Sequence, residues 1–444
     1  MNLTSAAWAG LKAQWRDPQG RIVIYAALLL AISLPLNYLL LRLTGWSVLW
    51  PTRAWVLGDA GSSGDSWRVM QLALNWIRSH PDGGLYRAIF FEGQNKFQYA
   101  PTSLLPMVGL EALGLTPNAE LLNQINRLFI LLTAGAVAGL TYRLLDGVKF
   151  VEPGLMRAAT AALAGAAVLV FYPVMMAYHL GQLQVWINML FAFACLAWAS
   201  ERRGMAGVLI GLVCLLKPQF GLFALWGLLR RDWRFLVALC ITSAVGLLIS
   251  IGLFGLKNHL EYLPVLQFLS QHGESYWANQ SLNGLLHRLV GNSVTDWVAD
   301  EFPPYNPLVY GGSMIATVAI LALALSARRG TRPQVALMDF MLAALAFTVA
   351  SPIAWEHHYG VLAPMFAALF AVVLASPQDQ GRKNWLIALA VCFVFAANCF
   401  VSTRALAGAP FNIVQSYLYF AALGVLVMLW RRLNGPAAIR TKTA

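Results

Sequence analysis

Apolar runs of about 20 residues alternate with short polar stretches along almost the whole chain. A helix needs a run of this length to cross the hydrocarbon core of a bilayer. The pattern therefore predicts an all-α polytopic membrane protein whose transmembrane helices form a single domain over residues 1–433. The expected helical runs are Ile22–Leu43, Leu121–Leu145, Ala158–Tyr178, Leu183–Ala199, Met205–Leu216, Phe220–Leu229, Phe235–Leu256, Leu308–Ala327, Val335–Ala350, Val361–Ala375, Trp385–Phe400 and Phe411–Trp430.

Composition favours the same class. Hydrophobic residues make up 59% of the chain and charged residues only 11%, whereas soluble domains carry about 25% charged residues. The run Ile22–Leu43 is too long for the apolar part of a signal peptide, so we expect it to remain as the first span with the N-terminus inside. The five cysteines lie in apolar runs without metal-ligand spacing, and the polar, basic tail 434–444 is expected to be disordered.

The net charge of +12 fits a membrane protein better than a protein that binds nucleic acid. Lys and Arg form short clusters at the ends of apolar runs, as cytoplasmic loops do, and no basic patch interleaved with aromatic residues is present. Placing the basic loops in the cytoplasm puts two long polar loops, 44–106 and 257–307, on the outer side. This topology requires that Thr102–Leu115 does not cross and that Met205–Leu229, interrupted at Lys217-Pro218-Gln219, is a hairpin of two half-helices. A single kinked crossing is the alternative, and it would invert the neighbouring loops.

The first outer loop contains an amphipathic pattern over Asp65–Arg78. It predicts a helix that lies flat in the membrane interface, is capped by Ser62 or Ser63 and ends at His80-Pro81-Asp82-Gly83-Gly84. The apolar positions that share one face at helical spacing are Trp67, Met70, Leu74 and Ile77, and those that face away are Arg68, Gln71, Asn75 and Arg78.

Asp65 is the carboxylate of this loop that is the candidate catalytic residue. It falls in the first turn of the expected helix, where the helix dipole favours an ionised carboxylate. An acid that only stabilises the helix is the simpler interpretation, and Asp59 is the competing candidate for a catalytic role.

Lys217 is the second candidate because it lies deep in an apolar run. An ionisable group inside the membrane is costly and therefore suggests a function, with an anion such as a lipid phosphate as its expected partner. The alternative is that the side chain extends to an interface, as long basic side chains do.

Further polar and aromatic groups fall in the expected outer loops. His357 and His358 are adjacent, so on a helix they point about 100° apart and make a poor chelate; one of them can bind a phosphate or orient a base, or both can serve as interfacial residues. The remaining candidates carry amides suited to sugar hydroxyls, rings that can stack on a sugar or pack the loop, or a carboxylate beside the histidines. They are Gln182, Asn279, Gln280, Tyr86, Tyr99 and Glu356.

Taken together, these motifs resemble the GT-C superfamily of glycosyltransferases and, within it, family 87, which is of the polyprenyl-phosphate-mannose-dependent mannosyltransferase type. The resemblance covers most of the chain from Asp65 to Tyr359. The chain departs from the family at Val69-Met70, where a tyrosine is usual, at Tyr99-Ala100-Pro101, where Tyr-Pro-Pro is usual, and at Glu356, where Asp is common. The motifs that carry the resemblance are Asp65, Gly84-Leu85-Tyr86, Phe97-Gln98-Tyr99-Ala100-Pro101, Gly181-Gln182, Ala206-Gly207 leading to Lys217-Pro218, Asn279-Gln280-Ser281-Leu282-Asn283-Gly284, and Ser351-Pro352 through His357-His358.

The resemblance implies a GT-C-type bundle in the cell inner (plasma) membrane, with a long extracytoplasmic first loop that bears an interfacial helix and an active site facing the periplasm or exterior. It implies that a hexose, with mannose as the first choice, passes with inversion from a polyprenyl-phosphate sugar to a glycolipid or glycan acceptor, and that Asp65 is the general base. No cofactor is expected, and nothing in the sequence requires a divalent metal. The implied donor-phosphate ligands are Lys217, His357, His358 and Arg68, and the implied substrate contacts are Tyr86, Tyr99, Gln182, Asn279, Gln280 and Glu356.

A transporter or flippase of a lipid-linked sugar is the main alternative, since transporters also use broken helices and buried charge. The chain lacks the internal repeat of many transporters, and transport does not require an acid in an interfacial loop helix. A structural membrane subunit is a third class, but it would leave the gathering of polar motifs on one side unexplained.

Overall fold

The computed structural model describes residues 17–44, 49–58, 64–146, 153–294, 301–329 and 333–434, together with Trp15, Val148 and Val298. Asp59, Ser62, Ser63 and the tail beyond Asn434 lie outside the described residues. The α-helices are α2 (Pro18–Thr44), α3 (Trp50–Leu57), α4 (Asp65–Ser79), α5 (Leu105–Ala112), α6 (Ala119–Leu144), α7 (Pro153–Val168), α8 (Tyr172–His179), α9 (Gln184–Ala199), α10 (Arg203–Leu216), α11 (Leu222–Arg230), α12 (Trp233–Phe254), α13 (Leu256–Leu260), α14 (Tyr262–His272), α15 (Leu282–Leu289), α16 (Pro307–Ser326), α17 (Pro333–Val349), α18 (Leu362–Leu374), α19 (Gln380–Ala397) and α20 (Tyr417–Asn434). The short π- and 3₁₀-turns are η1 (Arg87–Glu92), η2 (Pro101–Leu104), η3 (Pro218–Gly221), η4 (Glu356–Val361), η5 (Val401–Leu406) and η6 (Asn412–Ser416).

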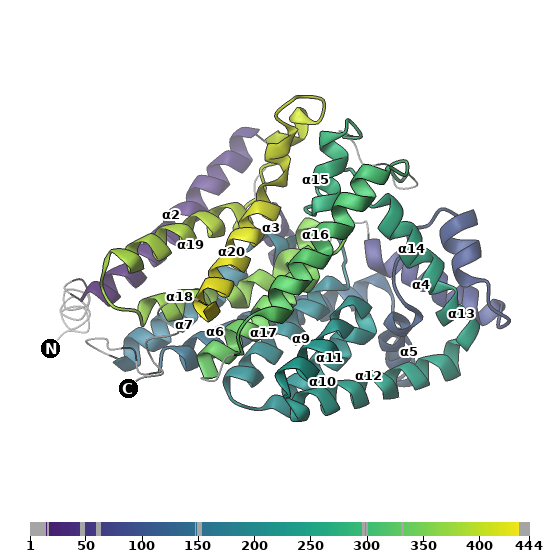
Figure 1. Ribbon diagram of the computed structural model, residues 1–444, viewed down its shortest axis with the longest axis horizontal. Helices are drawn as coiled ribbons and strands as arrows, with labels where there is room; N and C mark the ends of the chain where they lie inside the picture. Colours follow the sequence, from purple (N-terminus) through teal and green to yellow (C-terminus); the bar gives the residue numbers. More distant parts are fainter. Residues whose placement is uncertain are drawn as a thin grey trace.

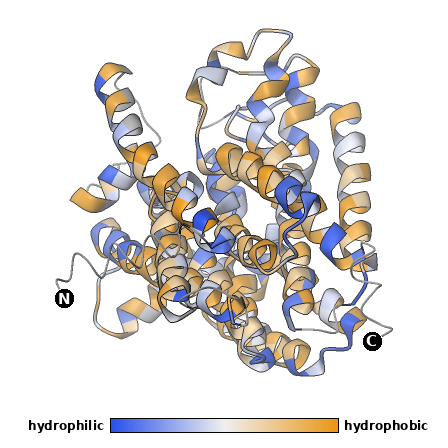
Figure 2. Ribbon diagram, turned by 90° about the vertical axis from the view of Figure 1, so that its left-hand side faces the viewer, coloured by the Kyte–Doolittle hydropathy of each residue, from blue (hydrophilic) through white to orange (hydrophobic). Residues whose placement is uncertain are grey.

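The helices form one bundle, and the described ranges contain no β-strand, only an isolated bridge between Asn279 and Trp355 (Figure 1). Among the described residues, six helices are long and apolar enough to cross a membrane, or seven if the bent pair α7–α8 is one span. Figure 2 shows hydrophobic residues along most of the helices. The prediction of an all-α polytopic membrane protein is confirmed.

The bundle has a buried centre and an apolar outer surface. In α17 every residue from Ala336 to Val349 is buried, whereas α12 and α16 expose large apolar side chains such as Ile241 and Ile315. Since lipid tails are as apolar as leucine, exposed side chains of this kind are compatible with hydrocarbon. We therefore place α12 and α16 against lipid and α17 in the core.

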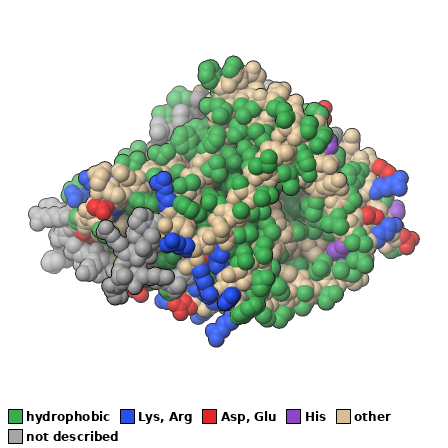
Figure 3. Space-filling model, viewed as in Figure 1, with side chains coloured by type: hydrophobic (Ala, Val, Ile, Leu, Met, Phe, Trp, Pro, Cys, Tyr) green, Lys and Arg blue, Asp and Glu red, His purple; other side chains and the backbone are tan. Residues whose placement is uncertain are grey.

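The basic loops meet at one end of the molecule, which we call the basic end. Residues at the ends of successive helices contact one another there. Figure 3 shows Lys and Arg side chains along the lower-left and lower edges, where these helix ends lie in Figure 1. The contacts that define the basic end are Arg157 with Asp146 (3.0 Å), Arg203 with Asp232 (3.8 Å), Arg230 with the Leu325 carbonyl (2.9 Å), Arg328 with Asn434 (3.2 Å), and Arg382 with Gln19.

The run Met205–Leu229 is a hairpin, as the favoured topology requires. Helix α10 ends at Leu216, and the chain turns at Lys217 and Pro218 before α11 returns to the basic end. A Cβ added to Gly207 would lie 2.3 Å from the carbonyl oxygen of Phe235, and one added to Gly246 would lie 2.3 Å from Leu215. Helices α10 and α12 are thus parallel, so α11 must carry the chain back between them.

Two expected helices differ in detail. The run Ala158–Tyr178 is divided into α7 and α8 with a bend of 43°, because Pro173 cannot donate a hydrogen bond at the start of α8. The helix expected from Phe411 begins only at Tyr417, since the carbonyl of Gln415 accepts a hydrogen bond from the Gln280 amide (2.6 Å) rather than from the next helical turn.

The remaining polar loops meet at the opposite end, which we call the site end; among the described residues it comprises 64–117, 180–183, 255–294, 301–306, 350–361 and 398–416. The two long outer loops are fastened to each other there. The backbone N–H of Gly84 donates to Glu261 (3.1 Å), and Lys96 forms a buried ion pair with Glu274 (3.0 Å). The loop after α4 and the loop after α12 therefore form one layer over this end of the bundle.

Candidate active site

Helix α4 is held by its first residues against the turn between α8 and α9. The backbone N–H groups of Asp65 and Ser66 donate to the carbonyls of Leu180 (2.9 Å) and Gly181 (3.2 Å). These bonds use donors that a helix N-terminus otherwise leaves unsatisfied. They fix the position of the Asp65 carboxyl relative to the turn.

Two glycines permit this close approach. Gly64, the residue before α4, has φ = 46°, and Gly181 has φ = 63°, which are left-handed conformations that favour glycine. A Cβ added to Gly181 would lie 2.9 Å from the Cα of Gly64 and 3.2 Å from the ring of Trp67. A larger residue at position 181 would therefore push α4 away from the turn, whereas at position 64 a side chain would have space but would strain the left-handed backbone.

The predicted helix is confirmed, but its surroundings differ from the prediction. The predicted apolar face is buried, with Trp67 1% and Met70 0% exposed, and Arg68, Asn75 and Arg78 are exposed. This face packs on protein rather than lying in lipid, because the Trp67 indole donates to Asn123 (2.9 Å) and its ring contacts Trp186 (6.3 Å between centroids).

Asp65 belongs to a hydrogen-bonded cluster drawn from three parts of the chain. The amide nitrogen of Gln182 donates to the Asp65 carboxylate (3.3 Å), and the Gln182 amide oxygen accepts from the hydroxyls of Ser66 (2.8 Å) and Tyr99 (3.1 Å). The Ser66 and Tyr99 hydroxyls are themselves 2.7 Å apart. With both hydroxyls directed at its oxygen, the amide of Gln182 must present its N–H to Asp65.

Burial raises the pKa of the Asp65 carboxyl above its usual range. The hydrogen bond from Gln182 and the positive charge of Arg68, one turn further along α4, act in the opposite direction and favour the ionised form. Asp65 is thus a partly buried acid whose proton affinity is higher than that of an ordinary aspartate. This property suits a group that must accept a proton.

Lys217 lies at the tip of the α10–α11 hairpin, inside the bundle. Its ammonium group is 3.4 Å from the Gln184 amide oxygen, and the Gln184 amide nitrogen donates to Asn188 (2.9 Å). His357 and His358 in η4 lie close enough for the charge of Lys217 to act on both imidazoles. The structure therefore brings three of the four predicted phosphate ligands together.

A single short segment connects the two groups of residues. Gln182 contacts Asp65, and Gln184, two residues further on, contacts Lys217. The acid and the lysine therefore lie on either side of the turn between α8 and α9. Sequence reasoning missed Ser66 and Gln184, although the polar spacing of Gln182 and Gln184 ahead of an apolar helix was a signal that could have indicated them.

The fourth phosphate candidate and four of the substrate candidates are placed differently. Arg68 is exposed beside Asn95 (3.5 Å), on the same helix as Asp65. The others are buried and engaged in holding the fold together: the Tyr86 hydroxyl donates to the Tyr99 carbonyl (2.6 Å), and Asn279 and Gln280 bond backbone groups of the 352–354 and 415–419 segments. Glu356 accepts from the hydroxyls of Tyr417 (2.7 Å) and Tyr172 (3.4 Å).

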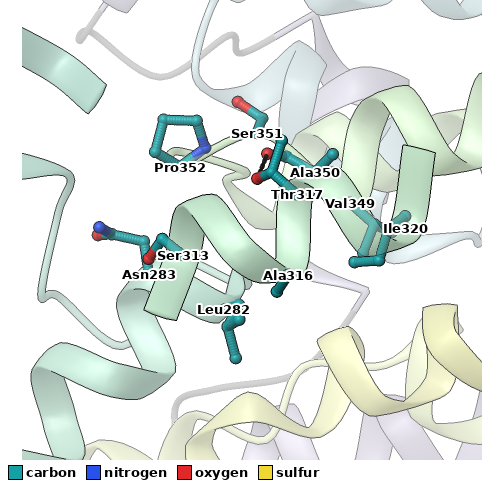
Figure 4. A pocket seen from close by; sticks show the side chains of 10 residues that line it. All are labelled: Leu282, Asn283, Ser313, Ala316, Thr317, Ile320, Val349, Ala350, Ser351 and Pro352. Carbon is teal, nitrogen blue, oxygen red and sulfur yellow. Dashed lines mark hydrogen bonds between the residues drawn. The ribbon is translucent and has the colours of Figure 1, made fainter. Parts of the chain in front are cut away.

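A small pocket with a cavity volume of about 10 Å³, room for about one water molecule, lies beside the second outer loop, between α15, α16 and the end of α17 (Figure 4). It is lined by Asn283, Ser313, Thr317, Ser351 and Pro352 among others, and by neither Asp65 nor Lys217. Within the described ranges, no group of three or more His, Cys, Asp or Glu side chains can hold a metal ion.

The fold and these two groups of polar residues define a polytopic helical membrane protein with an acid and a buried lysine at one end of its bundle. The family model for glycosyltransferase family 87 matches residues 97–352, more than half of the chain, and the chain belongs to this family. The match begins after Asp65 and ends before Glu356, His357 and His358, so these four residues lie outside it.

Two curated proteins of Mycolicibacterium smegmatis are similar to the chain. A polyprenol-phosphate-mannose-dependent alpha-(1-2)-phosphatidylinositol mannoside mannosyltransferase is 28% identical over 249 residues, which cover 54% of this chain and 52% of that protein. A probable arabinosyltransferase B is 32% identical over 109 residues, which cover 21% of this chain and 10% of that protein. The chain thus matches about half the length of the first relative and a tenth of the second, and no solved structure gives a significant match.

Proposed function

We propose that this protein is a membrane glycosyltransferase that moves a hexose, with mannose as the first choice, from a polyprenyl-phosphate sugar to a glycolipid or glycan acceptor. The observation that carries the proposal is the position of Asp65. Gln182 holds its carboxyl on one side of the turn between α8 and α9, and Gln184 contacts Lys217 on the other side. Membership of glycosyltransferase family 87 and the similarity to a polyprenol-phosphate-mannose-dependent mannosyltransferase support the reaction class.

Asp65 acts as the general base. It accepts the proton of the acceptor hydroxyl as that oxygen attacks the anomeric carbon from the face opposite the phosphate. The new carbon–oxygen bond forms as the bond from the anomeric carbon to the phosphate oxygen breaks, so the configuration inverts. Gln182, with Ser66 and Tyr99 behind it, keeps the carboxylate oriented for this proton transfer.

The leaving group is a lipid phosphate, which gains negative charge as the sugar departs. Fixed cations stabilise such charge most strongly where water is excluded. Lys217 supplies one such cation from inside the bundle and Arg68 supplies another from the surface of α4, while the imidazoles of His357 and His358 offer ring N–H groups to the phosphate. Gln184 keeps the Lys217 ammonium directed toward this region.

Four of the predicted substrate residues support the site without contacting the substrate. Tyr86, Asn279, Gln280 and Glu356 are buried, and their hydrogen bonds hold the outer loops onto the bundle. In the proposal they position the loops, whereas Tyr99 and Gln182, beside Asp65, are the candidates for direct contact with the sugar or the acceptor.

We assign the site end to the periplasm or exterior and the protein to the cell inner membrane. The support is the gathering of basic loops at the opposite end, since such loops remain in the cytoplasm. A donor attached to a membrane lipid suits this side, where nucleotide sugars are not supplied. The mechanism calls on no cofactor.

The test is a transfer assay with the full chain reconstituted in proteoliposomes. Polyprenyl-phosphate mannose labelled in the sugar is supplied together with a panel of glycolipid acceptors, and a nucleoside-diphosphate mannose is supplied in parallel. We expect label to enter an acceptor only from the lipid-linked donor. Movement of the donor between leaflets without any transfer would instead indicate a flippase and would contradict the proposal.

A further inference from the structure

A groove runs between α19 and α20 on the surface of the bundle. Its volume is about 400 Å³, and its wall is mostly apolar. Its lining residues follow helical spacing on both helices: Asn384, Trp385, Ala388 and Cys392 on α19, and Leu423, Gly424, Val427, Met428 and Arg431 on α20.

The groove has a polar end and an apolar end. Asn384 and Arg431 lie where α19 begins and α20 finishes, which is the basic end of the molecule. The apolar end lies at Gly424, where an added Cβ would be only 2.6 Å from the sulfur of Cys392, so the two helices touch there.

Two arginines lie at the polar end of the groove. Arg431 is exposed and lines the groove, and the guanidinium of Arg432 lies over the ring of Trp385 (4.2 Å), which also lines it. The Nε and Nη2 atoms of Arg432 are buried without a hydrogen-bond partner in the described structure. This end therefore offers positive charge to an anion, directly from the exposed Arg431 and from Arg432 behind the Trp385 ring.

We propose that this groove binds one acyl chain of an anionic glycerophospholipid, with the lipid phosphate at Arg431 and Arg432. A chain that starts at the basic end and extends toward Gly424 would lie along apolar side chains, as the tail of a phospholipid in that leaflet does. Basic pockets between transmembrane helices are suited to anionic headgroups. The donor lipid does not fit this position, because the cations proposed for its phosphate lie around Lys217 inside the bundle.

The test uses the full chain purified in mild detergent, stripped of lipid and titrated with phosphatidylglycerol or phosphatidylcholine, with bound lipid counted by native mass spectrometry. Ala388→Trp fills the groove, and Ala390→Trp is its control, because both alanines are exposed on α19 but only Ala388 lines the groove. Arg431→Gln removes the charge at the polar end, and Arg231→Gln removes an exposed arginine elsewhere at the basic end.

We expect wild type, Ala390→Trp and Arg231→Gln to bind one phosphatidylglycerol more tightly than phosphatidylcholine. Arg431→Gln should weaken phosphatidylglycerol binding about fivefold, the effect of one basic residue near an anionic lipid, and Ala388→Trp should abolish the bound lipid. Equal binding by Ala388→Trp and Ala390→Trp, or no preference for phosphatidylglycerol, would overturn the inference. A dimer that forms only while Ala388 is unchanged would also overturn it, by assigning the groove to a second copy. None of these outcomes bears on the proposed transfer reaction.

Discussion

At the scale of single residues, the site depends on how Asp65 balances burial against its partners. Burial raises its pKa, while Gln182 and Arg68 favour the ionised form. A base that works from this position is half ionised at a higher pH than an exposed aspartate. The catalytic rate should therefore fall as the pH drops through this raised value.

Arg68→Gln should move the acidic limb of the kcat/KM profile to higher pH. Removing the positive charge leaves burial less opposed, so the pKa of Asp65 rises further and the base is lost at a higher pH. Arg78→Gln is the control, because Arg78 lies at the far end of α4 and pairs with Glu111. Profiles with the same acidic limb in wild type and Arg68→Gln would show that the limb belongs to another group.

Lys217→Ala should weaken donor binding by about 10- to 100-fold, which is the contribution of one hydrogen bond to a charged group. Lys217→Arg should retain part of the affinity, and Gln184→Leu, which leaves the charge but removes its neighbour, should cause a smaller loss. The measurement is equilibrium binding of a polyprenyl-phosphate sugar to each variant in detergent. Unchanged affinity in Lys217→Ala would remove this lysine from the phosphate site.

At the scale of the elements, sequence reasoning located the helices well and the contacts between loops poorly. The spacing of Trp67, Met70 and Ile77 was sufficient to predict α4, because one face of a helix must be apolar if it is buried. Spacing says nothing about what covers that face, and the partner is protein rather than lipid. The contact between Gln280 and Gln415 joins positions 135 residues apart, so no local pattern could indicate it.

The layer of outer loops should depend on the buried ion pair between Lys96 and Glu274, whose side chains are 12% and 4% exposed. Lys96→Met leaves the Glu274 carboxylate buried without its cation, which should cost about 3 kcal/mol and lower the midpoint of thermal unfolding in detergent. Arg87→Gln breaks the exposed pair with Glu92 and should cause no measurable change. Equal midpoints for the two variants would mean that the Lys96 pair does not stabilise the layer.

At the scale of the whole molecule, the loops separate into two groups, one at the basic end of the bundle and one at the site end. The charge pattern was sufficient to predict which loops lie together, because the basic loops do meet at one end. The hairpin at Lys217 was one of two topologies that the sequence allowed. The parallel packing of α10 and α12 decides between them, and only tertiary contacts could reveal it.

Cysteine labelling should reveal this arrangement in intact cells. In a background without the native cysteines, single cysteines at Arg202 and Arg231, which flank the hairpin and are exposed, should react only after the membrane is opened. A cysteine at Asp82, exposed in the first outer loop, should react with an impermeant reagent in intact cells. A continuous crossing would instead put Arg202 and Arg231 on opposite sides.

Asp65→Asn tests the central claim most directly, with Asp82→Asn, an exposed acid of the same loop, as its control. The measurement is single-turnover transfer from a polyprenyl-phosphate sugar in proteoliposomes, with donor binding and thermal stability followed in parallel. A carboxyl whose pKa is raised in the folded protein stabilises it fully below its unfolded pKa and loses that stabilisation as the pH rises through its folded pKa, so the neutral amide should not lower the unfolding midpoint near pH 7. We expect Asp65→Asn to bind the donor and melt like wild type while losing transfer, and Asp82→Asn to retain transfer. Transfer at the wild-type rate in Asp65→Asn would contradict the assignment of Asp65 as the base.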